Sequence, residues 1–98
     1  MSLPVILRPE AQADIRSARD YLEEARPGLG AKFLAQVRKT LERIESMPKM
    51  YGAVWGDVRA ARTRKFVYIV YYVVFSDRVD VIAVLHGARD SSAWQARL

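Results

Sequence analysis

The hydrophobic pattern of this chain changes its period at about residue 58, and this change limits the folds that the chain can adopt. Before that point, apolar residues recur every three or four positions, which is the spacing of amphipathic helices. After it, the run Phe66–Phe75 consists of aromatic and β-branched residues and is apolar at successive positions. Such a run predicts a central strand covered on both faces. The first half of the chain should therefore be mainly helical, and the second half should form a sheet.

Two helices are predicted in the first half. Pro9 suits the first turn of a helix, and apolar residues at helical spacing continue to about Ala25. The sequence Pro27–Gly30 breaks this helix, and a second helix with a regular apolar stripe is predicted from about Ala31 to Met47. Because the two helices are similar in length and a short turn joins them, they should pack as an antiparallel hairpin.

Four strands and a short terminal helix complete the predicted fold. The strands are residues 5–7, 58–64, 66–75 and 79–86, residues 50–55 form a loop, and the last helix begins after a cap at Asp90 or Ser91. The order is β-α-α-β-β-β with a C-terminal helical turn. This is an α+β fold in which the helix hairpin covers one face of a mainly antiparallel sheet. The other face should then be partly open.

Length and composition are those of a single domain that spans residues 1–98. A hydrophobic fraction of 51% argues against disorder. The chain has no cysteine and one histidine, so we expect no disulfide, no metal site and no cofactor. The N-terminal residues lack the pattern of a signal peptide, and the longest apolar run is too short to span a bilayer. These features predict a cytoplasmic protein.

The positive charge is concentrated in the second half of the chain. Residues 1–47 hold eight Lys/Arg and seven Asp/Glu, a balance of +1, whereas residues 48–98 hold eight Lys/Arg and four Asp/Glu, a balance of +4, which together give the net charge of +5. A basic half implies an acidic partner, which could be nucleic acid, an acidic protein segment or an anionic surface. The alternative is that the charge only keeps the protein in solution.

Four cations occur within seven positions at the predicted strand 58–64. They are Arg59, Arg62, Arg64 and Lys65. Guanidinium groups fixed on a sheet present planar, bidentate donors to phosphate or carboxylate groups. The alternative is an edge strand that its charges protect from aggregation.

The single histidine ends the strand predicted at residues 79–86. A period of two places His86 on the same face as Ile82 and Val84, either as a titratable functional group or as a hydrogen-bonded structural residue. Arg89 follows three residues later and could converge with the strand that carries Arg62. The tyrosines of the central strand are expected to pack in the sheet, although one exposed tyrosine could stack on a base.

The stretch from Arg59 to Trp94 resembles the RelE/ParE family of toxins from bacterial type II toxin–antitoxin systems, of the plasmid stabilisation type. The resemblance rests on the tyrosine-rich strand, the following turn and strand, and the ending His86-Gly87-Ala88-Arg89-Asp90 with Trp94 after it. The N-terminal Leu7-Arg8-Pro9-Glu10-Ala11 is similar to the start of the first helix in this family. The resemblance covers nearly the whole chain, and the β-α-α-β-β-β order matches the fold of the family.

This resemblance implies one of two activities. RelE-like members cut messenger RNA on the ribosome, and in that interpretation the catalytic residues would be Arg62, Arg64, His86 and Arg89. ParE-like members are thought to poison DNA gyrase without cutting RNA. The ending of this chain looks more like the ParE side, so we expect a gyrase or topoisomerase inhibitor that is not an enzyme. We assign its target-binding surface to Arg59, Arg62, Arg64, Lys65, His86, Arg89 and Trp94.

The resemblance also implies a cognate antitoxin that wraps the domain and neutralises it. The open face of the helices and the loop around Met50, Tyr51, Val54 and Trp55 are apolar enough to serve as a docking groove for such a partner. The alternative is that Trp55 folds under its own loop. A further possibility is a degenerate toxin that has lost toxicity and only binds its antitoxin.

Overall fold

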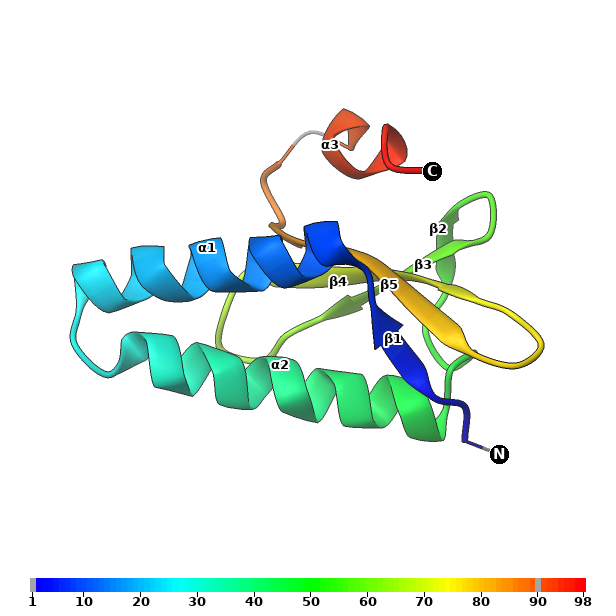
Figure 1. Ribbon diagram of the computed structural model, residues 1–98, viewed down its shortest axis with the longest axis horizontal. Coiled ribbons are helices and arrows are strands. Elements are labelled where there is room, and N and C mark those ends of the chain that lie inside the picture. The colour runs from blue at the N-terminus through cyan, green and yellow to red at the C-terminus, as the bar shows by residue number, and fades with distance from the viewer. Residues whose placement is uncertain (1, 90) are drawn as a thin grey trace.

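The computed structural model describes residues 2–89 and 91–98, and these residues form an α+β fold. In chain order the elements are β1 (Val5–Leu7), α1 (Pro9–Ala25), α2 (Leu29–Ser46), β2 (Ala53–Trp55), β3 (Val58–Arg62), β4 (Tyr68–Val74), β5 (Val79–His86) and α3 (Ser92–Gln95). Figure 1 shows the two long helices running side by side next to the sheet, with α3 apart from them. The predicted helix hairpin, mainly antiparallel sheet and short terminal helix are therefore confirmed.

The five strands lie in the order β1-β5-β4-β3-β2. β3, β4 and β5 pair in antiparallel fashion, and β1 pairs in parallel with the first half of β5. The tyrosine-rich run is a central strand, as predicted, although regular pairing is limited to β4. Residues 53–55, which were predicted to lie in a loop, instead form β2 and pair with β3 at the edge of the sheet. That part of the prediction is wrong.

The turn between α1 and α2 is stabilised by the Glu23 carboxylate, and the two helices approach each other closely at Gly30. Gly28 takes a φ of 91° before α2, a conformation that favours glycine. Both carboxylate oxygens of Glu23 accept hydrogen bonds from this turn, one from Gly28 N at 2.9 Å and one from Gly30 N at 3.0 Å. A Cβ atom on Gly30 would lie only 2.9 Å from the carbonyl oxygen of Arg19, so α1 and α2 could not approach each other this closely. These contacts start α2 at Leu29, two residues before its predicted start.

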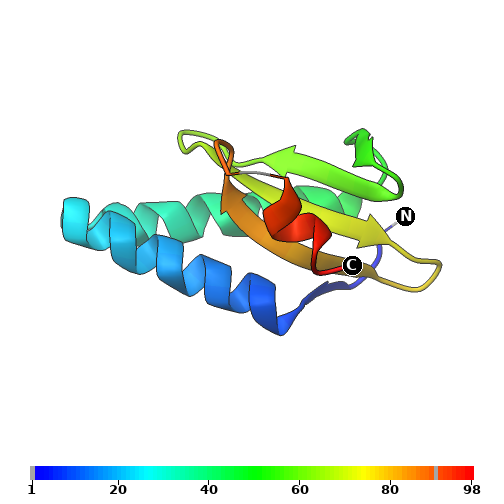
Figure 2. The same ribbon diagram turned by 90° about the horizontal axis from the view of Figure 1, so that it is seen from above.

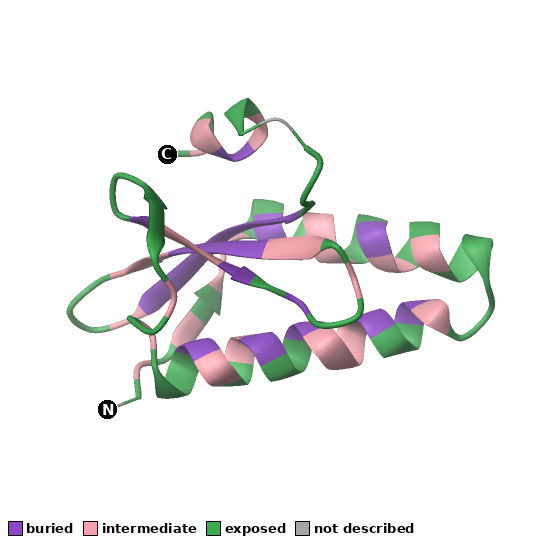
Figure 3. Ribbon diagram, turned by 180° about the vertical axis from the view of Figure 1, so that it is seen from behind, coloured by how far each residue is buried: buried purple, intermediate pink, exposed green. Residues whose placement is uncertain are grey.

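The main core lies between the helix hairpin and one face of the sheet. The hairpin buries small and apolar side chains that include Ala11, Ala18, Phe33, Val37 and Ile44, and the sheet contributes Ala61, Val70, Tyr72, Val79, Val81 and Val84. Figure 3 shows these buried positions on the inner sides of the helices and along the central strands. Burying apolar side chains between two layers is the main source of stability for a fold of this size.

The opposite face of the sheet is partly covered by α3. Trp94 is buried there against the ring of Tyr71, with a centroid distance of 4.8 Å and an interplanar angle of 21°. Ile82 and Leu85 belong to the same cluster. Figure 2 shows α3 lying across the sheet on this side. Asp90, one of the two expected helix caps, lies outside the described residues, and Ser91 makes no side-chain capping bond.

A β-bulge in β5 changes which residues face the helices. Tyr71 pairs with Ala83 and Tyr72 pairs with Val81, so Ile82 is an extra residue on β5. Ile82 and Ala83 consequently both belong to the cluster under α3, while Val84 belongs to the core under the helices. The expectation that Ile82 shares a face with Val84 and His86 is therefore wrong, because a strict period of two does not survive the bulge.

The edge of β5 beyond β1 is held by Asp14 of α1 and by Arg97 from the C-terminal end of the chain. The carboxylate of Asp14 accepts a hydrogen bond from Val84 N at 3.0 Å. Arg97 donates to this carboxylate at 2.6 Å and to the Ile82 carbonyl oxygen at 3.1 Å. The ion pair raises the pKa of Arg97. One carboxylate thus fastens both α1 and the C-terminal segment to the bulged strand.

Candidate interaction surfaces

Most of the predicted target-binding cations meet at one end of the sheet. β3 ends, β4 begins and β5 ends there, since Arg62 pairs with Ile69 and His86 pairs with Tyr68. We call this surface the basic end and define it as Arg62, Arg64, Lys65, His86 and Arg89, all of which are exposed. Alternation along the strands puts Arg62 on the α3 side and His86 on the helix side, so the basic end wraps around the end of the sheet.

The turn between β3 and β4 presents Arg64 and Lys65, directly after Arg62 at the end of β3. Thr63 is buried, and its hydroxyl donates to the carbonyl oxygens of Phe66 at 3.3 Å and Tyr68 at 3.1 Å. Lys65 has a φ of 67°, which is uncommon for a residue with a Cβ atom. This turn ends β3 at Arg62, two residues before the predicted end. A hollow of about 470 Å³ is lined by residues 62–67.

His86 and Arg89 line a second, smaller hollow at the end of β5. Its volume is about 240 Å³, and Tyr21 and Tyr68 contribute to its wall. The Nδ1 atom of His86 accepts a hydrogen bond from Ala88 N at 3.0 Å, which leaves Nε2 as the ring nitrogen available to a ligand. The imidazole also meets the ring of Tyr68 edge-on at a centroid distance of 5.5 Å. His86 is therefore an exposed residue whose ring also makes structural contacts.

The tyrosines of β4 are poor candidates for a general base. Burial raises the pKa of Tyr68, and Tyr21 adds to this rise. Burial also raises the pKa of Tyr71, and it raises that of Tyr72 to about 12, although the charge of Arg59 opposes the effect. All three phenols therefore hold their protons more firmly than a free tyrosine does at neutral pH.

Arg59, expected with the other cations, lies in a different place. One guanidinium nitrogen donates to the Tyr51 carbonyl oxygen at 2.6 Å and to that of Lys49 at 3.4 Å. The hydroxyl of Tyr72 holds the same loop by donating to the Pro48 carbonyl oxygen at 2.8 Å. The structure thus uses Arg59 to fasten the loop after α2. It does not place Arg59 in the basic end.

Trp94 is also absent from the basic end. Its side chain is 4% exposed, stacks on Tyr71 and meets the edge of Trp55 at a centroid distance of 6.1 Å. A partner could reach the indole only if α3 moved. The sequence pattern did not reveal this position, because a single tryptophan in a short segment has no periodicity that distinguishes core from surface.

An apolar surface lies at the opposite end of the molecule. Val54 and Trp55, in the predicted antitoxin-docking loop, are about half exposed, at 55% and 51%. Tyr51 is partly buried, and its hydroxyl accepts a hydrogen bond from Arg43 Nε at 3.0 Å. Trp55 therefore remains largely accessible on β2 while its ring contacts Trp94.

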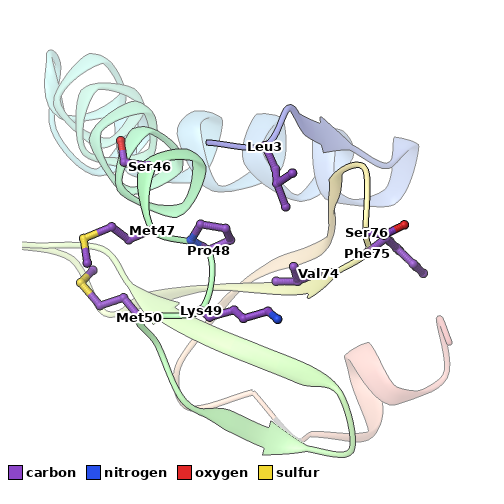
Figure 4. A pocket seen from close by; sticks show the side chains of 9 residues that line it. All are labelled: Leu3, Ser46, Met47, Pro48, Lys49, Met50, Val74, Phe75 and Ser76. Carbon is purple, nitrogen blue, oxygen red and sulfur yellow. The ribbon is translucent and has the colours of Figure 1, made fainter. Parts of the chain in front are cut away.

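A pocket that the sequence did not predict lies near this loop. It has a volume of about 610 Å³ and is lined mainly by apolar side chains from three segments, with Leu3, Met47, Pro48, Met50, Val74 and Phe75 among them. Figure 4 shows these side chains around the end of α2 and the last residue of β4. Met47, Met50 and Phe75 are exposed large hydrophobic residues, a feature of protein-binding surfaces. Only the fold brings Leu3 and Phe75 to the same pocket.

The described residues contain no group of three or more side chains that could hold a metal ion. Within the same residues, none of the helices has the length and apolar character needed to cross a membrane.

Comparison with known proteins identifies the family. The family model described as "ParE toxin of type II toxin-antitoxin system, parDE" matches residues 5–91. A solved structure titled "Chromosomal ParDE TA system from P. aeruginosa" matches with a TM-score of 0.76 at 12% sequence identity, covering 87% of this chain and 96% of the other. At that identity the structural likeness shows the fold alone. A comparison with curated proteins finds no match. Because the family model spans most of the chain, this protein belongs to the ParE toxin family of type II toxin–antitoxin systems.

Proposed function

We propose that this toxin inhibits DNA gyrase or a related topoisomerase, and that a cognate antitoxin neutralises it. Its target-binding surface would be the basic end, with Arg62, Arg64, Lys65, His86 and Arg89 as the contacting residues. This activity would take place in the cytoplasm, where topoisomerases act on DNA. Binding a target needs complementary charge and shape but no bond-breaking chemistry.

One observation carries this proposal: among the described residues, the basic end offers several cations but few candidates for a general base. Cleavage of RNA by its 2′-hydroxyl needs a general base, a general acid and cations for the developing charge. The cations are present, but the raised pKa values of the three tyrosines of β4 disfavour the phenolate that a tyrosine general base requires. His86 is the single histidine of the chain and could fill only one of the two roles at a time.

A messenger RNA endonuclease is the second candidate function. It is favoured by the hollow that both His86 and Arg89 line, where an exposed imidazole side chain lies near a cation. In that case Arg62, Arg64, His86 and Arg89 would form the active site. The choice between the two functions depends on whether messenger RNA is cut in cells that produce the protein.

The antitoxin would occupy the apolar end of the molecule. Val54 and Trp55 are exposed on an edge strand, and the pocket beside Met47 and Met50 can take apolar side chains. An extended segment that folds on binding could cover both, with the partly buried Tyr51 at the border. Such a partner would leave the basic end free or cover it only by extending around the sheet.

Inducible expression tests these proposals in cells. We expect growth arrest with gyrase-linked DNA breaks and intact messenger RNA, and we expect the double variant Arg62→Gln/Arg64→Gln to reduce both arrest and breaks. Arg38→Gln is the matched control, because Arg38 is an exposed arginine on α2 outside the basic end. New RNA ends inside codons that disappear in His86→Ala would support the nuclease and exclude the gyrase proposal. Normal growth of cells that produce the folded protein would indicate a degenerate toxin.

The docking surface has its own test. Co-expression with a neutralising antitoxin should restore growth, and Trp55→Glu should weaken this rescue while leaving toxicity intact. Ile6→Glu changes a comparably exposed apolar residue on β1 at the other edge of the sheet and serves as the control. Equal rescue of Trp55→Glu and the unchanged toxin would place the antitoxin elsewhere.

A further inference from the structure

Two cations from the helix hairpin extend the basic end beyond the residues that the strands supply. A hollow of about 410 Å³ lies between the hairpin and the β3–β4 turn, and Arg26, Lys32 and Lys65 line it together with Phe66. Lys65 and Phe66 also line the hollow that contains Arg62 and Arg64. The two hollows therefore adjoin at one lysine and one aromatic ring.

The residues that line these two hollows include five cations and no carboxylate. The cations are Arg26, Lys32, Arg62, Arg64 and Lys65. Within the described part of the chain, none of them forms an ion pair with a carboxylate. Glu23 belongs to the same helix turn, but both of its oxygens accept hydrogen bonds from Gly28 and Gly30. Within the described residues, these five cations thus have no carboxylate partner in an ion pair.

The turn that carries Lys65 is held rigidly in an uncommon backbone conformation. The φ of 67° at Lys65 places this residue in the left-handed region, where a side chain is disfavoured. The buried Thr63 side chain fixes the turn from inside through two hydrogen bonds. Phe66 is anchored below by an edge-to-face contact with Phe33 at 5.5 Å. Lys65 therefore lies between the two hollows on a turn whose backbone is fixed by these contacts.

The two ends of the sheet differ in their exposed side chains. The turns at the other end of the strands carry charges of both signs. Asp57 lies between β2 and β3, and Asp77 lies between β4 and β5 beside Arg78, with which it forms an ion pair. The large exposed apolar residues of the pocket and of β2 are also at that end, whereas Val67 is the one such residue among those lining the two hollows. A cationic surface with few apolar anchors is suited to the phosphate groups of a polyanion.

We propose that Arg26, Lys32, Arg62, Arg64 and Lys65 form a binding site for the phosphodiester backbone of a nucleic acid. The arginines can hold phosphate oxygens with two donors each, and the lysines add point charges. Phe66, between the hollows, can contact a base or sugar, because it is half-buried and reaches both hollows. The site needs no sequence readout, since its contacts are to phosphate.

This inference deepens the proposed function, on which it rests: a topoisomerase holds DNA, so a toxin with such a site would contact the DNA as well as the enzyme. Backbone contacts would orient the toxin on the complex of enzyme and DNA. They would also make its action depend strongly on salt concentration. The same phosphate contacts would bind RNA if the toxin acts on the ribosome. The binding experiment distinguishes DNA from RNA as the ligand.

Fluorescence anisotropy with the purified full-length chain tests the site directly. The probes are labelled single-stranded DNA, duplex DNA and single-stranded RNA of equal length and mixed sequence. We expect binding of DNA whose affinity falls steeply with salt, and we expect Lys32→Gln/Lys65→Gln to weaken it at least tenfold at low salt. The slope of log affinity against log salt should decrease by about 1 for each cation removed. Arg38→Gln/Lys39→Gln removes two charges from α2 outside the hollows and should preserve most of the binding.

Three results would overturn the site. The first is no binding to any of the probes at low salt. The second is an equal loss in the control variant, which would mean that only net charge matters. The third is displacement of the DNA by polyglutamate at the same concentration of negative charge, which would point to an acidic protein partner. Tight binding to RNA alone would retain the phosphodiester site but assign it to the nuclease function. Toxicity that persists without nucleic-acid binding would leave the proposed function standing and exclude this inference.

Discussion

Replacing Asp14 by alanine should destabilise the protein far more than its position on a helix surface suggests. The side chain of Asp14 is 11% exposed and that of Arg97 is 21% exposed, so water replaces only part of their interaction. Without the carboxylate, the Val84 N–H group and the Arg97 guanidinium both lose an acceptor. A hydrogen bond to a charged group contributes about 1.5–3 kcal/mol, and an unsatisfied buried donor costs about 1–3 kcal/mol.

We therefore expect Asp14→Ala to lower the free energy of unfolding by about 2–4 kcal/mol. Arg97→Ala should cost less, about 1–2 kcal/mol, because Asp14 would still accept the bond from Val84 N. Asp20→Ala is the matched control. Its pair with Arg19 lies on the same helix, but the Asp20 side chain is 69% exposed, so the expected loss is below about 1 kcal/mol.

Urea unfolding followed by tryptophan fluorescence provides the assay. Trp94 lies in the segment that Arg97 fastens, so its emission reports the release of α3 as well as global unfolding. If Asp14→Ala and Asp20→Ala unfold at the same urea concentration, Asp14 does not hold the edge of β5. If Arg97→Ala costs more than Asp14→Ala, the carboxylate is not the shared acceptor that the structure shows.

Three further predictions concern the core and the helix hairpin. Gly30→Ala should cost about 1–3 kcal/mol, because the new Cβ atom would press on α1, whereas Gly52→Ala, with nothing within 4 Å of its Cβ position, should be nearly neutral in thermal unfolding. Trp94→Ala should cost about 3–5 kcal/mol in urea unfolding, and Trp55→Ala, at a half-exposed position, should cost clearly less. Burial raises the pKa of Tyr72 to about 12, so the folded state keeps this proton to a higher pH than the unfolded state does. The free energy of unfolding should therefore fall as the pH rises from about 10 towards 12. Tyr72→Phe should flatten that part of the pH profile in urea unfolding.

Local pattern was enough to predict the large elements. The helical stripe of α2 and the continuous apolar run of β4 are long and strongly periodic, and each found its expected place. β2 was missed because it is short and exposed throughout, and only its pairing with β3 defines it as a strand. The bulge at Ile82 was also invisible, since it depends on register with β4 and not on residue type.

The sequence could indicate that the candidate site is rich in cations, but it could not indicate which cations belong to it. Arg62 and Lys65 could be recognised from the density of charge in one segment. Arg59 belongs to the same segment, but its guanidinium group donates a hydrogen bond to the Tyr51 carbonyl oxygen in the loop after α2. No local sequence pattern predicts this contact. Lys32 joins the basic end from a helix more than thirty residues away in sequence, because the hairpin turn and the β3–β4 turn line the same hollow. Charge density thus indicates that a surface exists, and tertiary packing decides which residues share it.

Purified protein added to DNA gyrase and plasmid DNA tests the central claim most directly. The measurement is the amount of cleaved plasmid that remains covalently bound to the enzyme, together with the rate of supercoiling. The proposed function predicts that supercoiling falls and cleaved complexes accumulate, that Arg62→Gln/Arg64→Gln reduces both effects, and that Arg38→Gln does not. Normal supercoiling without trapped breaks, at concentrations of a folded chain that arrest growth in cells, would contradict it.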